Sequence, residues 1–234
     1  MNLQCTNVLE HFMYIHECLQ IEIKENESYL LHYSFDKQFD KSQWTYYLDF
    51  LPVSFQKEVL RYRRWQDRYN CLLGKLMVYA GFYLFNAHKI EFKNFLKDSY
   101  GKPFIKNSNL NFNISHSGNT VVCIFSHQDI GIDIEEIQHI EYTLFENVFS
   151  DQEMQKIEQY GVSKFYEYWT KKEAIIKAIG KGMSIPLLDI KLEDNYSIYN
   201  GNRWYTKSEK MGNVYCSIAS QYQQNNVNLI ELIF

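Results

Sequence analysis

The chain has 234 residues, of which 46% are apolar and 17% aromatic, and its formal net charge is −4. A chain of this length and apolar content buries a sizeable core, which excludes an intrinsically disordered protein. The negative charge excludes a protein that binds nucleic acid over a generally basic surface, and no apolar run is long enough to cross a membrane.

The five cysteines are scattered along the chain, and no two of them have the Cys-x-x-Cys spacing of a redox or metal site. We interpret them as free thiols in a reducing compartment. The first 20 residues mix acidic residues and histidines with apolar ones, and they lack the basic start and apolar centre of a signal peptide. We therefore expect a soluble, cytoplasmic protein.

The apolar patterns predict helices and strands in chain order. Residues 22–33 have the composition of strands with a polar turn between them, and residues 51–83 show the 3.6-residue period of one long helix. The remaining predicted elements are three short strands (110–114, 121–125, 130–134), two helices (144–159, 164–179) and a strand meander over 191–234 with runs at 203–207, 215–220 and 227–234. Gly180 is a good C-terminal stop for the second helix.

These elements alternate without a regular βαβ rhythm, which favours an α+β fold with mainly antiparallel sheets. A boundary near residue 128 would divide the chain into two similar halves, residues 1–128 and 129–234. We expect basic site residues from the first half and acidic site residues from the second, for the reasons given below.

Two pairs of residues indicate chemistry in the second half. Asp133 and Glu135 are two apart on a predicted strand, so both carboxylates point to one face, where a divalent cation such as Mg²⁺ would neutralise them. A solvated edge strand is the alternative. Glu173 and Lys177 are four apart and share a helix face, either as an ordinary ion pair or as a metal ligand beside a phosphate-binding cation.

A row of basic residues indicates a phosphate-binding surface in the first half. Lys57, Arg61, Arg64 and Arg68 lie at i, i+4, i+7 and i+11, which is one side of the predicted helix. This local positive charge suits a multiply charged phosphate ligand. The alternative is the solvated face of an amphipathic helix; DNA binding is less favoured because the basic row is short.

Five segments occur in a diagnostic order: NISHSG (113–118), GIDIE (131–135), FSDQE (149–153), WTKKEAIIKAIGKG (169–182) and SIPL (184–187). Together they resemble the Sfp-type 4′-phosphopantetheinyl transferases, and the resemblance runs from about residue 51 to residue 188. It implies a pseudo-dimer of two similar α+β halves, each with a small, mainly antiparallel sheet and helices. The active site would lie between the halves of a functional monomer.

The resemblance also implies a reaction. Such enzymes transfer the 4′-phosphopantetheine arm of coenzyme A to a serine of an apo acyl or peptidyl carrier protein and release adenosine 3′,5′-bisphosphate, with Mg²⁺ as cofactor. Asp133, Glu135 and Glu173 match the metal ligands. Glu153 matches the base that acts on the carrier serine, with an exposed helix glutamate as the alternative. Lys177 matches the cation that stabilises charge on the phosphoryl oxygens.

Several further positions match coenzyme A contacts. Ser115 and His116 resemble phosphate contacts, although a turn serine and a core histidine are the alternatives when each is taken alone. Lys102 resembles a phosphate partner, and Lys57 and Arg61 are candidates for gripping the nucleotide. The resemblance also assigns contacts to the coenzyme to three residues already introduced: Asp133, Glu173 and Lys177.

Two other classes of protein stay open from the residues. One is a magnesium nuclease or phosphodiesterase, and the other is a non-catalytic protein that binds coenzyme A or a carrier. Nucleic-acid cleavage without coenzyme A would identify the first, and coenzyme A binding without transfer would identify the second. We expect neither a nucleic-acid nor a membrane partner, and carriers of fatty-acid, polyketide and nonribosomal-peptide synthesis all remain candidates.

Overall fold

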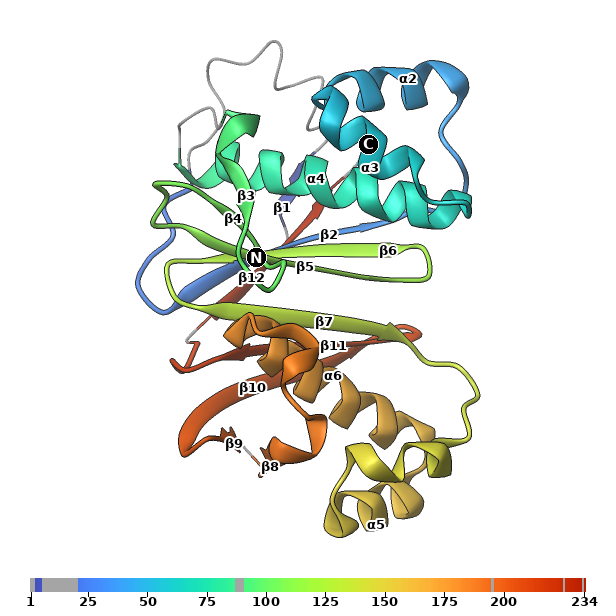
Figure 1. Cartoon of the computed structure of the whole chain (residues 1–234), viewed down its shortest axis with the longest axis vertical. Coiled ribbons are helices and arrows are strands. Elements are labelled where there is room, and N and C mark those ends of the chain that lie inside the picture. Colours follow the sequence, from blue (N-terminus) through green and yellow to red (C-terminus); the bar gives the residue numbers. More distant parts are fainter. Residues whose placement is uncertain (1–2, 6–20, 87–90, 195, 225, 233) are drawn as a thin grey trace.

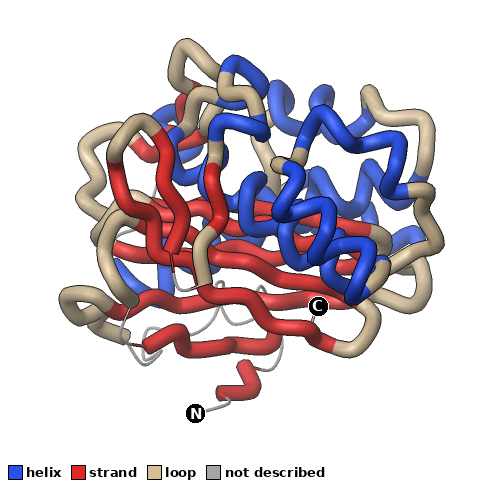
Figure 2. Tube along the Cα trace, turned by 90° about the horizontal axis from the view of Figure 1, so that it is seen from below, coloured by secondary structure: helices blue, strands red, loops and turns tan. Residues whose placement is uncertain are grey.

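Two five-stranded sheets face each other in the computed structural model of the chain, which describes residues 3–5, 21–86, 91–194, 196–224, 226–232 and 234 (Figure 1). The first sheet has the strand order β1 (Leu3–Cys5), β12 (Asn226–Leu232), β2 (Glu27–Ser34), β6 (Thr120–Ser126) and β5 (Asn111–Ser117). The second has the order β7 (Ile130–Glu136), β11 (Val214–Ser220), β10 (Asn202–Met211), β9 (Tyr196–Tyr199) and β8 (Lys191–Leu192). Figure 2 shows the strands of both sheets running in similar directions.

Helices cover the outer face of each sheet. The first sheet carries α2 (Lys41–Asp49), α3 (Val53–Leu60) and α4 (Trp65–Asn86), followed by η1 (Phe92–Asn94) and a small hairpin of β3 (Phe95–Lys97) and β4 (Pro103–Ile105). The second half contributes η2 (Tyr142–Val148), α5 (Asp151–Tyr160), α6 (Val162–Ile179), η3 (Gly182–Ser184) and η4 (Leu187–Asp189). An apolar cluster between the sheets includes Ile124, Ile132 and Ile218. The fold is the expected α+β pseudo-dimer, although the first sheet is not mainly antiparallel, because its β1–β12 and β12–β2 pairs are parallel. No described helix is long and apolar enough to cross a membrane.

The predicted helix over 51–83 is wrong in one respect, because the chain breaks it into α3 and α4. Residues 61–64 lie in the break, where the Arg68 Nε donates to the Tyr62 carbonyl oxygen at 2.7 Å and satisfies an acceptor that a continuous helix would use. The four basic residues therefore do not form one stripe. Lys57 belongs to α3, Arg61 and Arg64 lie in the break, and Arg68 belongs to α4.

The predicted helix over 144–159 is also divided. Its first part is the irregular η2, and α5 begins only at Asp151, after Ser150. Ser150 and Glu153 form a capping box, in which each side chain accepts from the backbone N–H of the other. The helix predicted over 164–179 is confirmed, since α6 ends at Ile179 and Gly180 follows with φ +80°.

The strand predicted over 227–234 is confirmed as β12, but its predicted place in a meander over 191–234 is wrong. β12 leaves the second sheet and runs parallel to β2 in the first sheet, where Ile230 and Leu232 are buried in the core. This pairing covers the edge that β2 would otherwise expose.

The division of the chain at residue 128 stays a prediction. Expectations for residues 1–20 lie outside the described residues except for β1, and the three cysteines whose side chains are described (Cys71, Cys123, Cys216) are free thiols.

The two halves meet where β5 lies beside β7. Side chains of β5 accept from alternate backbone N–H groups of β7: Asn113 Oδ1 from Ile132 (2.9 Å), Ser115 Oγ from Ile134 (3.2 Å) and Ser117 Oγ from Glu136 (2.9 Å). The side chains thus take the place of the backbone carbonyls of a normal strand pair. We call this row of three contacts the seam.

Gly131 lets β7 approach α6 very closely. A Cβ atom at this position would lie 2.0 Å from the Ala174 carbonyl oxygen and 2.4 Å from the Ala178 nitrogen, both of which are backbone atoms. Gly131→Ala is therefore expected to destabilise the fold by about 1–3 kcal/mol, measured as a lower urea midpoint. Gly74→Ala is the control, because its Cβ would meet only the Ile114 side chain, at 3.3 Å. Equal midpoints for the two variants would contradict the close approach.

Candidate active site

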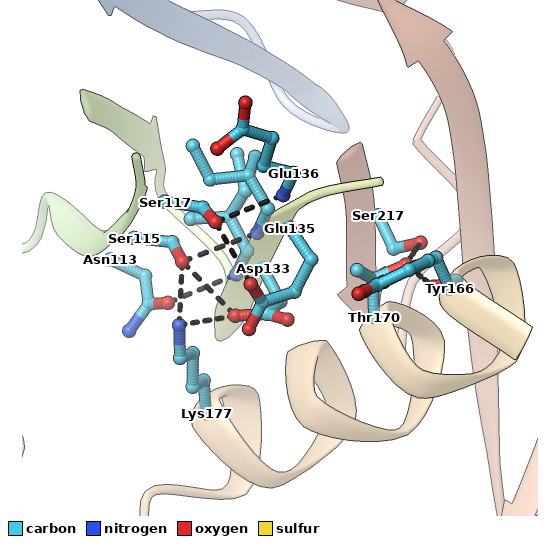
Figure 3. A network of polar contacts seen from close by, with 12 residues as sticks. Asn113, Ser115, Ser117, Asp133, Glu135, Glu136, Tyr166, Thr170, Lys177 and Ser217 are labelled. Atoms are coloured by element: carbon cyan, nitrogen blue, oxygen red, sulfur yellow. Dashed lines mark hydrogen bonds and ion pairs between the residues drawn. The ribbon is translucent and has the colours of Figure 1, made fainter. Parts of the chain in front are cut away.

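Asp133 is the central residue of the site. It lies on β7 with only 4% of its surface exposed, and its Oδ1 accepts from Ser115 Oγ at 3.0 Å and from Lys177 Nζ at 2.6 Å (Figure 3). The Lys177 ammonium also donates to Ser115 Oγ at 2.8 Å. The other oxygen, Asp133 Oδ2, is buried and has no hydrogen-bond partner among the described residues. A buried carboxylate oxygen without a partner is costly, so it indicates a missing ligand.

The charge of Asp133 shifts the pKa of two further carboxyl groups, those of Glu135 and Glu173. Burial raises the pKa of Asp133, while the neighbouring Lys177 ammonium lowers it. Burial, and then the negative charge of Asp133, raise the pKa of Glu135 and also that of Glu173. The structure therefore brings together the three predicted metal ligands as mutually repelling groups, and Ser115 and Lys177 with them.

The donor chemistry of these residues suits a magnesium ion, because carboxylate oxygens are ligands that Mg²⁺ prefers. As the structure stands, however, no three His, Cys, Asp or Glu side chains among the described residues form a group that could hold a metal ion. Mg²⁺ commonly takes one or two carboxylates and fills its other positions with phosphate oxygens and water. An unpartnered Asp133 oxygen beside two carboxyl groups of raised pKa is consistent with such an incomplete site.

Replacement of Glu173 by glutamine is expected to stabilise the protein in the absence of metal. Folding raises the pKa of Glu173, so this group's contribution to stability is full at acid pH and is lost as the pH rises through the folded-state pKa. The glutamine variant should melt about 2–4 °C higher in EDTA at neutral pH. The gain should vanish in melts below the ordinary glutamate pKa. Glu158→Gln, at an exposed position of α5, should show no gain; a gain of equal size there would contradict the account.

A cavity of about 630 Å³ adjoins this group of residues. Residues of both halves line it, among them Ile114 and Pro103 from the first half and Trp169, Glu173 and Lys177 from the second. Its wall is mostly apolar, and one of its charged lining residues, Lys177, is bonded to Asp133. A larger cavity of about 1050 Å³ lies at one end of the two sheets. Of these two cavities, only the smaller one is lined by Glu173 and Lys177.

Two predicted coenzyme contacts, Lys102 and His116, have no described hydrogen bond to Asp133, although the charges of His116 and Asp133 act on each other. Lys102 lines the smaller cavity, but its Nζ donates to the Ala178 carbonyl oxygen at 2.8 Å, at the end of α6. Burial lowers the pKa of Lys102, and the charge of Asp129 partly opposes this. His116 follows Ser115 on β5 but lines the larger cavity.

Lys57 and Arg61 are the candidates for nucleotide binding. Lys57 and Arg61 line neither of the two cavities within the described part of the chain. The guanidinium of Arg61 lies 5.7 Å from the centre of the Tyr62 ring, in the break between α3 and α4. The structure does not bring these two residues to the carboxylates, and their contact with coenzyme A stays a prediction.

Glu153 has partners that the sequence did not predict. Its side chain is buried, and it accepts from the backbone N–H groups of Ser150 (2.9 Å) and Leu192 (3.2 Å) and from Lys172 Nζ (2.7 Å). The alternative of an exposed helix glutamate is therefore wrong. Neither Lys177 nor Asp133 is among its described hydrogen-bond partners, and its role as the base stays a prediction.

Two residues that contact predicted site residues were missed from the sequence. Lys172, which is fully buried, also donates to the carbonyl oxygens of Val148 (3.0 Å) and Leu187 (3.2 Å), and so it joins three segments beside Glu173. Ser117 donates to Glu135 Oε2 at 2.9 Å. The only signal in the sequence for Ser117 is its two-residue spacing from Ser115, which puts both on one side of a strand.

Two family profiles match adjacent parts of the chain. The profile described as the 4′-phosphopantetheinyl transferase superfamily matches residues 129–219, and the profile described as 4′-phosphopantetheinyl transferase, N-terminal, matches residues 38–128. Together they cover residues 38–219, which include every predicted site residue, while β1, β2 and β12 of the first sheet lie outside them.

Curated proteins similar to the chain are named as 4′-phosphopantetheinyl transferases too. The chain is 40% identical over 157 residues to the 4′-phosphopantetheinyl transferase gsp of Aneurinibacillus migulanus, covering 63% of this chain and 65% of that protein. It is 32% identical over 160 residues to the 4′-phosphopantetheinyl transferase Sfp of Bacillus subtilis strain 168, covering 65% of this chain and 70% of that protein. The match thus spans just under two thirds of the first relative's length.

Proposed function

The chain belongs to the Sfp-type 4′-phosphopantetheinyl transferases, and we propose that it transfers the 4′-phosphopantetheine arm of coenzyme A to a serine of an apo acyl or peptidyl carrier protein. The observation that carries the proposal is the Asp133 carboxylate. One of its oxygens is bound by Ser115 and Lys177, and the other is buried near Glu135 and Glu173 without a partner among the described residues.

In the proposed reaction, the carrier serine oxygen attacks the β-phosphorus of coenzyme A. The bond from that phosphorus to the bridging oxygen breaks, and adenosine 3′,5′-bisphosphate leaves. Asp133, Glu135 and Glu173 would hold Mg²⁺, which supplies positive charge to the phosphoryl oxygens when it is bound. Lys177 Nζ, now 2.6 Å from Asp133, adds a second positive charge where the phosphoryl oxygens become more negative.

A side chain of the protein also has to accept the proton that the carrier serine loses. Glu153 is the base that the family resemblance implies, but its carboxylate is engaged with Lys172 and two backbone N–H groups. Glu173 is a second candidate, because it lines the cavity and its pKa is raised toward neutrality by burial and by Asp133. The apolar wall of the cavity limits access of water, which would otherwise compete with the serine.

One chain supplies residues from both halves to this site, since Ser115 lies on β5 and Asp133 on β7. This supports our proposal that the protein works as a monomer. We also keep the proposals of a cytoplasmic location and of no nucleic-acid partner, on the basis of the free thiols and the negative net charge.

The test is to incubate the purified protein with coenzyme A, Mg²⁺ and several apo carriers and to weigh the carriers as intact proteins. We expect a mass gain of one phosphopantetheine arm, abolished by EDTA and restored by excess Mg²⁺. Coenzyme A binding without any gain would favour a binding protein. If the protein neither binds coenzyme A nor adds mass to any carrier, the proposed function is overturned.

A further inference from the structure

The Ser117 hydroxyl has two simultaneous hydrogen bonds, one across the seam and one to a predicted metal ligand. Its oxygen accepts from the Glu136 N–H at 2.9 Å, and it donates to Glu135 Oε2 at 2.9 Å (Figure 3). A serine hydroxyl has a single hydrogen to donate. Because the backbone of β7 fixes the oxygen, that hydrogen is committed to the Glu135 carboxylate.

Ser115 makes the corresponding contacts two residues earlier, but the carboxylate it binds is less dependent on it. Asp133 is held by Lys177 as well as by Ser115. The only hydrogen bond described for the Glu135 side chain is the one from Ser117. The orientation of Glu135 therefore rests on one donor, whereas that of Asp133 rests on two.

We propose that Ser117 is a positioning residue that holds the Glu135 carboxylate in the orientation that binds Mg²⁺. This inference rests on the proposed function, and it gives a role to a residue outside the coenzyme and metal contacts assigned above. Hydrogen bonds from neighbouring groups orient metal-ligating carboxylates, and their loss typically lowers metal affinity 10–100-fold. Without the hydroxyl, Glu135 would have to be ordered by the ion itself.

Ser117→Ala tests the proposal. We expect the Mg²⁺ concentration for half-maximal transfer to rise about tenfold, with the rate at saturating Mg²⁺ changed far less. A second readout needs no turnover: the Mg²⁺ concentration that half-saturates thermal stabilisation in the presence of coenzyme A should rise by a similar factor. Ser117→Thr keeps the hydroxyl and should restore the wild-type requirement.

Ser126→Ala is the matched control. Ser126 is a buried strand serine whose hydroxyl donates to the Glu27 carbonyl oxygen (3.3 Å) and accepts from the Gln128 N–H (3.2 Å), with no carboxylate among these partners. Its loss should lower the melting temperature and leave the Mg²⁺ requirement unchanged. If Ser117→Ala does not fold, Ser117→Cys, which has a weaker donor of similar shape, should raise the requirement in the same direction.

An unchanged Mg²⁺ requirement in both readouts, with only a lower melting temperature, would overturn the proposal and leave Ser117 as part of the seam alone. The same conclusion would follow if Ser117→Thr failed to restore the requirement while remaining folded. If the wild-type protein transfers nothing to any carrier, the proposed function fails. The thermal titration would still decide whether Ser117 controls metal binding.

Discussion

Asp133→Asn is expected to slow carrier modification about a thousandfold or more, at any Mg²⁺ concentration. The variant keeps the shape of the side chain but removes the buried charge that pairs with Lys177 and would bind the ion. A metal ion supplies several kcal/mol of transition-state stabilisation, and about 4 kcal/mol corresponds to three orders of magnitude in rate. The measurement is the initial rate of mass gain on the best carrier.

Asp36→Asn is the control for this prediction, because Asp36 is exposed in the loop between β2 and α2. Its rate should match that of the wild type. Both variants should be shown to be folded by thermal melting before the rates are compared. A rate for Asp133→Asn within tenfold of the wild type would contradict the assignment of Asp133 as a metal ligand.

Lys172→Met is expected to destabilise the protein by about 3–5 kcal/mol, the largest stability effect that we predict. Lys172 is fully buried, and its ammonium binds Glu153 at 2.7 Å. Its removal leaves a buried carboxylate without its counter-charge and takes a donor from the carbonyl oxygens of Val148 and Leu187, of which the Leu187 oxygen still accepts from the Ile190 N–H. Urea unfolding should show a much lower midpoint with an unchanged slope.

The double variant Glu153→Met with Lys172→Met separates the ion pair from the packing. Replacing both charges by apolar groups removes the unpaired carboxylate, so the double variant should be more stable than Lys172→Met alone. Equal or lower stability would show that the cost comes from packing and from the lost backbone contacts. Lys171→Met, which removes a partly exposed lysine of the same helix, should cost far less.

Glu153→Gln tests whether Glu153 is the base that takes the proton of the carrier serine. The amide keeps one oxygen, which can accept from either the Ser150 or the Leu192 backbone N–H but not from both, and it is unable to take a proton from the carrier serine. A folded variant with a rate within tenfold of the wild type would leave Glu173 as the better candidate. A loss beyond a hundredfold, with the melting temperature retained, would support Glu153.

Local patterns predicted the elements whose signals lie within a few residues. The alternation around Asp133 placed both carboxylates on one strand, and Gly180 ended α6 as expected. The capping box at Ser150 was also readable, and it would have moved the start of α5 to the correct residue. The break between α3 and α4 was not readable, because neither proline nor glycine occurs there.

Features that depend on distant pairing could not be derived in this way. The run that forms β12 has the same composition whether it continues a meander or crosses to the first sheet, and the choice depends on the open edge of β2. The contact of Ser117 with Glu135 likewise requires β5 to lie beside β7 in one register. The buried pair of Glu153 and Lys172 joins residues 19 apart on different helices.

The most direct test of the account is anomalous diffraction from crystals grown with coenzyme A and Mn²⁺ in place of Mg²⁺. We predict a manganese peak at the buried Oδ2 of Asp133, with Glu135, Glu173 and the coenzyme pyrophosphate around it. A peak at some other place, with coenzyme A bound and Asp133 still paired only with Ser115 and Lys177, would contradict the central claim.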